Sequence, residues 1–204
     1  MKILNLYAGI GGNRKLWGNE HQITAVELDP EIAKIYKDFF PDDEVIVGDA
    51  HQYLLEHYKE FDFIWASPPC PSHSRIRKFL GVDTRYQAKP IYPDMKLWQE
   101  IIFLQHHCKG KFCVENVIAY YEPLIKPLEM CKHWFWCNFN LPPMMTYGNR
   151  AHHADIEVLE ERKGFDIPEG IKDRRLLLRN CVEPEVGKYI LECAIAKIKT
   201  LGEF

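Results

Sequence analysis

A cysteine and a glutamate stand out because each follows a short apolar segment. Cys70 lies in the sequence Pro-Pro-Cys-Pro after the apolar residues 61–66, and Glu115 follows Phe112-Cys113-Val114. The flanking prolines hold the thiol stiffly, and a carboxyl group on an apolar strand is costly unless it is paired or functional. A buried, inert cysteine is the common alternative. If both segments are strands that end at one sheet edge, the two side chains indicate nucleophilic and acid chemistry there.

A glycine-rich loop precedes both residues. Residues 7–12 read Tyr-Ala-Gly-Ile-Gly-Gly and follow an apolar segment. Glycines allow a tight turn and a close approach of the backbone to a ligand. The nicotinamide fingerprint needs a glycine at position 14, where Arg14 stands, and the phosphate-binding P-loop pattern is also absent. We therefore expect a nucleoside cofactor without a pyrophosphate, although a simple strand–helix turn is the alternative.

Two carboxylates fit that expectation. Glu27 ends the second apolar segment, 18 residues after Gly9, where it could accept both ribose hydroxyl groups. Asp49 follows the third apolar segment, where it could accept from an adenine amino group. Ligands of open α/β sheets bind at the carboxyl ends of the strands. Three such features at successive strand ends favour a nucleotide-like site.

The elements that position these residues alternate between strands and helices. The predicted strands are Ile3–Tyr7, Ile23–Glu27, Glu44–Val47, Phe61–Ala66 and Lys111–Glu115. The predicted helices are Asn13–Asn19, Pro30–Phe39, Ala50–Tyr58 and Pro93–His107. This alternation predicts an α/β fold with a mostly parallel sheet and helices on both faces.

The pattern changes after about residue 138. Residues 138–173 are rich in Pro, Gly, His and charge, so irregular structure or a small insert is expected there. A C-terminal helix begins near Pro184, with a stripe formed by Val186, Tyr189, Ile190, Cys193 and Lys197. Trp134-Phe135-Trp136 is expected to be a buried aromatic strand.

Composition narrows the class of protein. The chain has 204 residues and a formal charge of −3, so any nucleic-acid contact needs a local basic face. An apolar run long enough for a membrane span is absent, and no secretory signal is visible. The seven cysteines are an odd number without a Cys-x-x-Cys pair. This indicates a reducing, cytoplasmic compartment rather than a disulfide scaffold.

The motifs, taken in order, resemble the cytosine C5 DNA methyltransferases, which use S-adenosylmethionine. The matching segments are residues 7–12, Glu27-Leu28-Asp29-Pro30, Gly48-Asp49-Ala50, Pro69-Cys70, Glu115-Asn116-Val117 and residues 179–184. The resemblance implies a Rossmann-like S-adenosylmethionine-dependent methyltransferase fold. It also implies that the Cys70 thiolate adds to C6 of a cytosine flipped out of double-stranded DNA, while Glu115 donates a proton to the base. C5 then takes the methyl group, and S-adenosylhomocysteine is the product.

The resemblance also implies which residues bind ligands. The cofactor contacts would be Tyr7, Ala8, Gly9, Ile10, Gly12, Glu27, Leu28, Asp49, Ala50, Pro69, Leu97, Asn180 and Cys181. The expected substrate contacts are Ser72, Ser74, Arg75, Arg77, Asn116, Lys132, His133 and Arg150. The basic residues after Cys70 could form a loop that closes over nucleic acid, although a solvated loop is equally compatible with the sequence.

Some positions depart from the family pattern. Pro71 replaces the glutamine that usually follows the cysteine, and His73 replaces an aromatic residue. The Ser-Pro-Pro-Cys start is similar to the branch that methylates transfer RNA, so RNA is the alternative substrate. The paired arginines that hold the flipped cytosine are missing, and Lys132, His133 or Arg150 could substitute. A catalytically weak nucleic-acid-binding protein is a further alternative.

The predicted organisation is a compact member of this family. Residues 1–137 would form the cofactor-binding and catalytic core, residues 138–173 a short target-recognition region, and residues 174–204 a C-terminal helix returning to the core. So short a recognition region predicts a very short target sequence or help from a second copy. We expect a monomer or weak homodimer of bacterial, archaeal or phage origin, without a membrane segment. The histidine pairs match no common zinc spacing, so no metal is expected.

Overall fold

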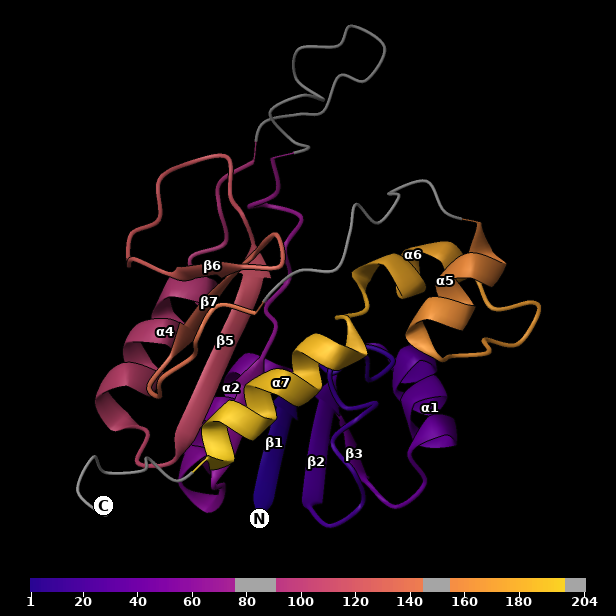
Figure 1. Cartoon of the computed structure of the whole chain (residues 1–204), viewed down its shortest axis with the longest axis horizontal. Helices are drawn as coiled ribbons and strands as arrows, with labels where there is room; N and C mark the ends of the chain where they lie inside the picture. Colours follow the sequence, from indigo (N-terminus) through magenta and orange to yellow (C-terminus); the bar gives the residue numbers. More distant parts are fainter. Residues whose placement is uncertain (76–90, 145–154, 197–204) are drawn as a thin grey trace, which may run out of the picture.

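A single seven-stranded sheet organises the chain in the computed structural model, which describes residues 1–75, 91–144 and 155–196 (Figure 1). The strands are β1 Lys2–Leu6, β2 Gln22–Glu27, β3 Glu44–Val47, β4 Phe63–Ala66, β5 Lys111–Val117, β6 Leu128–Met130 and β7 His133–Cys137. Their spatial order is β3-β2-β1-β4-β5-β7-β6. The pairs from β3 to β5 are parallel, whereas β7 runs antiparallel to both β5 and β6.

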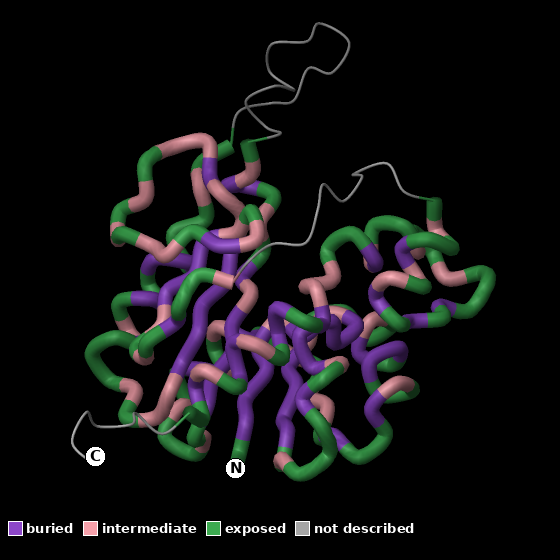
Figure 2. The backbone as a smooth tube through the Cα atoms, viewed as in Figure 1, coloured by how far each residue is buried: buried purple, intermediate pink, exposed green. Residues whose placement is uncertain are grey.

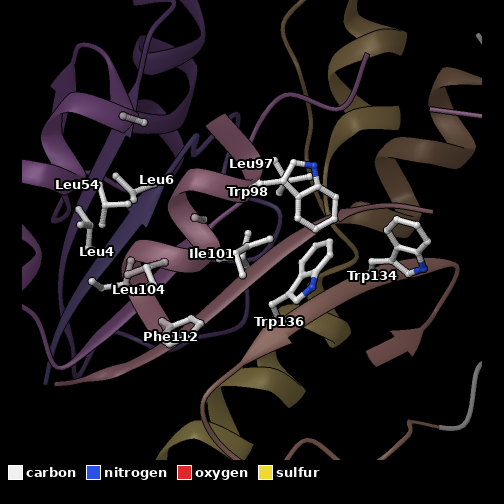
Figure 3. Close-up of a cluster of buried hydrophobic side chains, with 14 of the residues drawn as sticks. Leu4, Leu6, Leu54, Leu97, Trp98, Ile101, Leu104, Phe112, Trp134 and Trp136 are labelled. Atoms are coloured by element: carbon white, nitrogen blue, oxygen red, sulfur yellow. The ribbon is translucent and has the colours of Figure 1, made fainter. Parts of the chain in front are cut away.

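Helices cover both faces of this sheet. They are α1 Pro30–Phe39, α2 Ala50–His57, α4 Lys96–His107, α5 Ile156–Lys163, α6 Arg174–Asn180 and α7 Pro184–Ile195, with a 3₁₀ turn at Tyr58–Glu60. Successive residues of a strand point to opposite faces. Ile3 accordingly packs with α7, whereas Leu4 packs with α2 and α4 in the cluster of Figure 3. The fold is therefore the predicted α/β, Rossmann-like fold with a mostly parallel sheet.

The central strands β1, β4 and β5 are the most deeply buried part of the sheet (Figure 2). A third apolar cluster joins α1 to α5 and α6 through Tyr36, Phe40, Leu159, Phe165 and Leu178. The residues after β7 thus do not form a purely irregular region, because α5 lies within 138–173 and packs on the core. Within the described residues, none of the helices has the length and apolar character needed to cross a membrane.

Local sequence signals explain where two of the helices begin. The Asp29 carboxylate accepts from the backbone N–H groups of Glu31 and Ile32, and Pro30 occupies the first helical position of α1. The Asp49 carboxylate accepts in the same way from His51 and Gln52 at the start of α2. The predicted bounds Pro30–Phe39 and Glu44–Val47 are confirmed, and the other predicted strands shift by one or two residues at their ends.

The predicted helix Asn13–Asn19 is wrong, because this segment forms turns. Gly11 and Gly18 adopt left-handed backbone angles (φ +86° and +80°) and leave too few residues between them for a stable helix. The Asn13 side chain donates to Asn5 at 2.7 Å, and the Trp17 indole N–H donates to the Gly187 carbonyl at 3.0 Å. These tertiary contacts override the local helix preference.

The C-terminal region also departs in part from the prediction. It contains two helices, α6 and α7, instead of one. The predicted stripe of α7 is buried or partly buried at Val186, Tyr189, Ile190 and Cys193, and α7 ends at Ile195. Lys197 lies outside the described residues. The segment Trp134-Phe135-Trp136 is a buried strand, as predicted.

A buried ion pair replaces the missing helix as the anchor of the glycine loop. The Asp43 carboxylate accepts from Arg14 Nε at 2.8 Å and from the Tyr36 hydroxyl at 2.8 Å, and it is 3% exposed.

Removing one partner of a buried pair leaves the other charge uncompensated. We expect Asp43→Ala to lower the free energy of unfolding by about 3–5 kcal/mol in urea denaturation. The exposed neighbour is the control, since Asp42→Ala should change it by less than about 0.5 kcal/mol. Equal losses in the two variants would contradict a role for the buried pair.

Candidate active site

The glycine loop follows β1 at the carboxyl edge of the parallel strands. Tyr7 and Gly9 have left-handed backbone angles (φ +56° and +55°), and the Gly11 N–H donates to the Ala8 carbonyl at 3.0 Å. A Cβ atom added at Gly9 would meet no atom of the described chain within 4 Å, so the space beside this backbone is open. At Gly12 the reverse holds, because an added Cβ would lie 2.3 Å from Cys181 Sγ. The loop is therefore packed against the C-terminal motif on one side and open on the other.

Glu27 holds this loop from the end of β2. Its Oε2 accepts from the Gly9 N–H at 2.9 Å, and its Oε1 accepts from the Asp29 N–H at 3.1 Å. Next to it, Leu28 is 70% exposed and presents a free apolar surface. A carboxylate beside an open glycine and an exposed apolar side chain fits the ribose and base of a nucleoside.

Asp49 continues the same edge after β3. One of its carboxylate oxygens caps α2, and the other lies 3.4 Å from Lys96 Nζ, at the start of α4. The structure thus brings Gly9, Glu27 and Asp49 to neighbouring strand ends, as predicted from their positions. Of the other expected cofactor contacts, Leu97 is only 2% exposed within the core, and Asn180 is exposed at the end of α6.

The segment that carries Cys70 is held rigidly after β4. The N–H groups of His73 and Ser74 donate to the Cys70 carbonyl at 2.9 and 3.0 Å, which forms a turn immediately after the thiol. The Asn116 amide donates to the Pro68 carbonyl at 2.9 Å, and the Tyr120 N–H donates to the His73 carbonyl at 3.1 Å. The segment after β5 therefore fixes the backbone on which Cys70 stands.

Glu115 approaches this loop from β5. Its side chain is largely buried at 8% exposure. Burial raises the pKa of the Cys70 thiol, and the nearby Glu115 charge raises it further. His133, on β7, brings its Nε2 atom to 3.6 Å from Glu115 Oε1. The Glu115 charge therefore acts on the Cys70 thiol, and the His133 imidazole lies beside the Glu115 carboxylate.

Two of the eight expected substrate residues have been described above, namely His133 beside Glu115 and Ser74 in the turn after Cys70. The other six fall into three groups. Ser72 is buried and its hydroxyl accepts from the Asp94 N–H at 3.0 Å, while both polar groups of the Asn116 side chain contact backbone. Arg75 donates to the Ala119 carbonyl at 3.3 Å, and Lys132 is exposed in the turn between β6 and β7. Arg77 and Arg150 lie outside the described residues.

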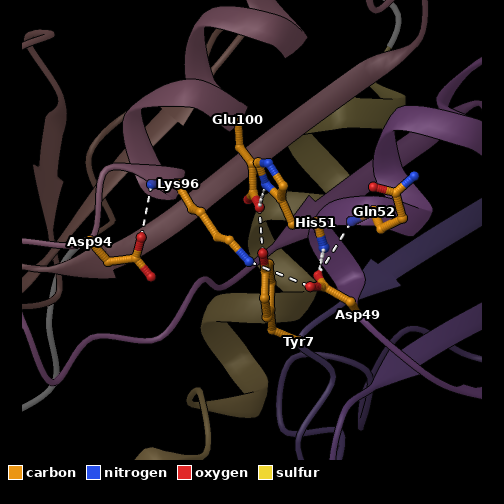
Figure 4. Close-up of polar contacts among 7 residues, drawn as sticks. All are labelled: Tyr7, Asp49, His51, Gln52, Asp94, Lys96 and Glu100. Carbon is orange, nitrogen blue, oxygen red and sulfur yellow. Dashed lines mark hydrogen bonds and ion pairs between the residues drawn. The ribbon is translucent and has the colours of Figure 1, made fainter.

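Four side chains that the sequence analysis did not count among the site residues adjoin the site, namely Glu100, His51, His73 and Tyr121. Glu100 contacts both the Tyr7 hydroxyl and His51, and it is 1% exposed (Figure 4). His73, itself 1% exposed, contacts the Tyr121 hydroxyl, and burial lowers the pKa of its imidazole. Glu100 could have been found, because it falls on the apolar stripe of α4 one turn after Leu97, where a charge requires an explanation. Within residues 1–75, 91–144 and 155–196, no three His, Cys, Asp or Glu side chains gather as a metal site.

Comparison with known proteins decides the family. The family described as C-5 cytosine-specific DNA methylase matches residues 1–121, more than half of the chain. The chain belongs to this family. Its methyl donor is accordingly S-adenosylmethionine, and the open Gly9 backbone beside Glu27 fits a nucleoside of that kind.

Among the individual proteins, a tRNA (cytosine(38)-C(5))-methyltransferase of Spodoptera frugiperda is 34% identical over 85 residues, which cover 39% of this chain and 26% of that protein. The chain thus matches about a quarter of that relative's length. A candidate DNA modification methyltransferase from an Escherichia coli prophage superposes with a TM-score of 0.45 at 14% identity, over 84% of this chain and 56% of the other. A SAM-dependent methyltransferase of Agrobacterium tumefaciens gives 0.42 at 13% identity, over 59% and 40%.

Proposed function

We propose that this protein transfers a methyl group from S-adenosylmethionine to C5 of cytosine in DNA. The observation that carries the proposal is the strand order: the glycine loop follows β1, Cys70 follows β4 and Glu115 lies near the carboxyl end of β5, and these three strands are parallel neighbours. Gly9, Glu27, Leu28 and Asp49 would hold the cofactor, which supplies an electrophilic methyl group when it is bound.

Cys70 would act as the nucleophile. Its thiolate forms a bond to C6, and the C5–C6 π electrons then make C5 an enamine carbon that can take the methyl group. Glu115 would donate a proton to N3 as negative charge develops on the ring. Methyl transfer releases S-adenosylhomocysteine. Water then takes the C5 proton, the Cys70 sulfur leaves C6 as the thiolate with return of the C5–C6 double bond, and N3 gives its proton back to Glu115. A base within a duplex is out of reach of this thiol, so the cytosine must flip out.

The raised pKa of Cys70 matters for this chemistry. Burial and the Glu115 charge keep the thiol protonated in the free protein.

The same site could accept cytosine in RNA. The similarity to the tRNA methyltransferase favours this second candidate, and it covers only part of each chain. Lys132, His133 and Arg75 would contact phosphate or base in either case, with Arg77 and Arg150 as further predicted contacts.

The proposed organisation of the chain has three parts. Residues 1–137 would form the cofactor-binding and catalytic core, residues 138–173 the target-recognition region and residues 174–204 the closing segment.

Glu27 offers a test of the cofactor site that needs no nucleic acid. Glu27→Ala removes the acceptor of the Gly9 N–H and the expected acceptor of the ribose. We expect the affinity for S-adenosylhomocysteine, measured by calorimetry, to fall by about tenfold to a hundredfold. Glu31→Ala, four residues further on and exposed on α1, is the matched control and should leave the affinity unchanged. An unchanged affinity in Glu27→Ala would place the cofactor elsewhere.

A further inference from the structure

We propose that Glu100 is a positioning residue of the cofactor site, which fixes the Tyr7 side chain in the glycine loop and links that loop to the start of α2. The inference rests on the proposed function only in taking the glycine loop as the cofactor site. It does not depend on which nucleic acid is methylated.

The contacts converge on one oxygen atom. The Tyr7 hydroxyl donates to Glu100 Oε1, and His51 Nδ1 lies 2.8 Å from the same oxygen. Figure 4 shows the three side chains coming from the glycine loop, α2 and α4. A single buried carboxyl group therefore joins three segments that are distant in the sequence.

The joined segments are the ones expected to hold the cofactor. Tyr7 begins the glycine loop in a left-handed conformation (φ +56°), two residues before Gly9. His51 follows Asp49 by two residues in the capped first turn of α2. A tyrosine with left-handed backbone angles is strained, and this conformation persists only where surrounding contacts stabilise it. The Glu100 contact supplies such a restraint and couples it to the turn that carries Asp49.

Burying the Glu100 carboxyl group costs free energy of folding. Glu100 is 1% exposed, and its second oxygen, Oε2, has no hydrogen-bond partner in the described part of the chain. Burial raises the pKa of Glu100, whereas the contacts with Tyr7 and His51 and the charge of Lys96 lower it in part. Burial and the negative charges of Glu100, Asp49 and Asp94 raise the pKa of Tyr7, so its hydroxyl remains the donor. An incompletely paired buried carboxyl normally destabilises a fold, and a positioning role accounts for its presence here.

Three variants test the coupling between Tyr7 and Glu100. Tyr7→Phe removes only the hydroxyl donor, Glu100→Leu removes the acceptor at similar size, and the third variant combines both changes. Calorimetric titration with S-adenosylhomocysteine gives the affinity, and thermal unfolding gives the stability. We expect each single variant to bind about tenfold more weakly. The double variant should bind no more weakly than the poorer single variant, because both changes remove the same contact.

Two further variants distinguish a positioning role of Glu100 from a general effect on protein stability. Glu100→Gln retains an oxygen that can accept from Tyr7, so it should restore affinity to within about threefold of the original protein. Glu56→Gln, an exposed glutamate of α2, is the matched control and should change neither quantity. Affinity losses that add in the double variant, or an unchanged affinity with a lower melting temperature, would overturn the proposal. Failure of cytosine methylation with these affinity changes intact would overturn only the proposed function.

Discussion

Replacing Cys70 with alanine is expected to lower methyl transfer by on the order of 10⁴-fold or more, while the affinity for S-adenosylhomocysteine stays within about twofold. The thiol forms the proposed bond to C6, and no other described group near the loop can replace a thiolate in that step. The backbone contacts that hold the loop come from Pro68, Cys70 and His73 carbonyl groups, so they survive the change.

Separating chemistry from folding needs a second cysteine variant. Cys108 lies after the far end of α4, where its thiol contacts the Gly110 carbonyl. Cys108→Ala should keep transfer within about twofold in the same assay. If Cys70→Ala retained a tenth or more of the activity, the nucleophile would have to be another group. If it lost cofactor binding as well, the change would have disturbed the fold and not only the chemistry.

Glu115→Gln is expected to lower methyl transfer by about 10²–10⁴-fold, because the amide cannot donate a proton in the same way to the ring nitrogen. The same change should have the opposite effect on the reactivity of the Cys70 thiol. The Glu115 charge raises the pKa of Cys70, so its removal lowers that pKa and increases the thiolate fraction at a given pH. Methyl transfer should therefore slow down while the thiol becomes more reactive.

Alkylation measures this second effect. Iodoacetamide modification of the Cys70 peptide, followed by mass spectrometry against pH, gives the pKa of this one thiol among the seven in the chain. We expect the profile of Glu115→Gln to shift to lower pH. Glu129→Gln, on the exposed side of β6, is the control and should shift neither quantity. A profile that did not move would show that the two side chains do not interact as the structure places them.

The prediction of the fold succeeded where local signals were strong. The cap at Asp29 with Pro30 defined α1, and the β-branched run Val45–Val47 defined β3. It failed at Asn13–Asn19, because Asn13 donates to Asn5 in β1 and Trp17 donates to Gly187 in α7, and a local helical pattern reveals neither contact. The helix α5 was missed because most of its residues are polar and its two buried side chains, Leu159 and Lys163, give almost no periodic pattern.

The candidate site shows the same contrast between residues that local sequence signals place and residues that only the tertiary fold places. Residues defined by strand ends, such as Glu27 and Asp49, could be placed together because topology alone brings strand ends to one edge. Side chains that reach the site from a helix could not be placed in this way. The contact of Glu100 with Tyr7 and His51 depends on the angle at which α4 packs on the sheet, and that angle is set by the tertiary fold. The predicted roles of the individual ligand-binding residues remain predictions.

One measurement tests the central claim most directly. The purified protein is incubated with methyl-labelled S-adenosylmethionine and, in parallel, with double-stranded DNA and with transfer RNA, and each product is digested to nucleosides for mass spectrometry. We predict labelled 5-methyldeoxycytidine from the DNA, and none with Cys70→Ala. Labelled 5-methylcytidine from RNA alone would contradict the choice of DNA and favour the second candidate. Label on neither, from protein that binds S-adenosylhomocysteine, would contradict cytosine methylation itself.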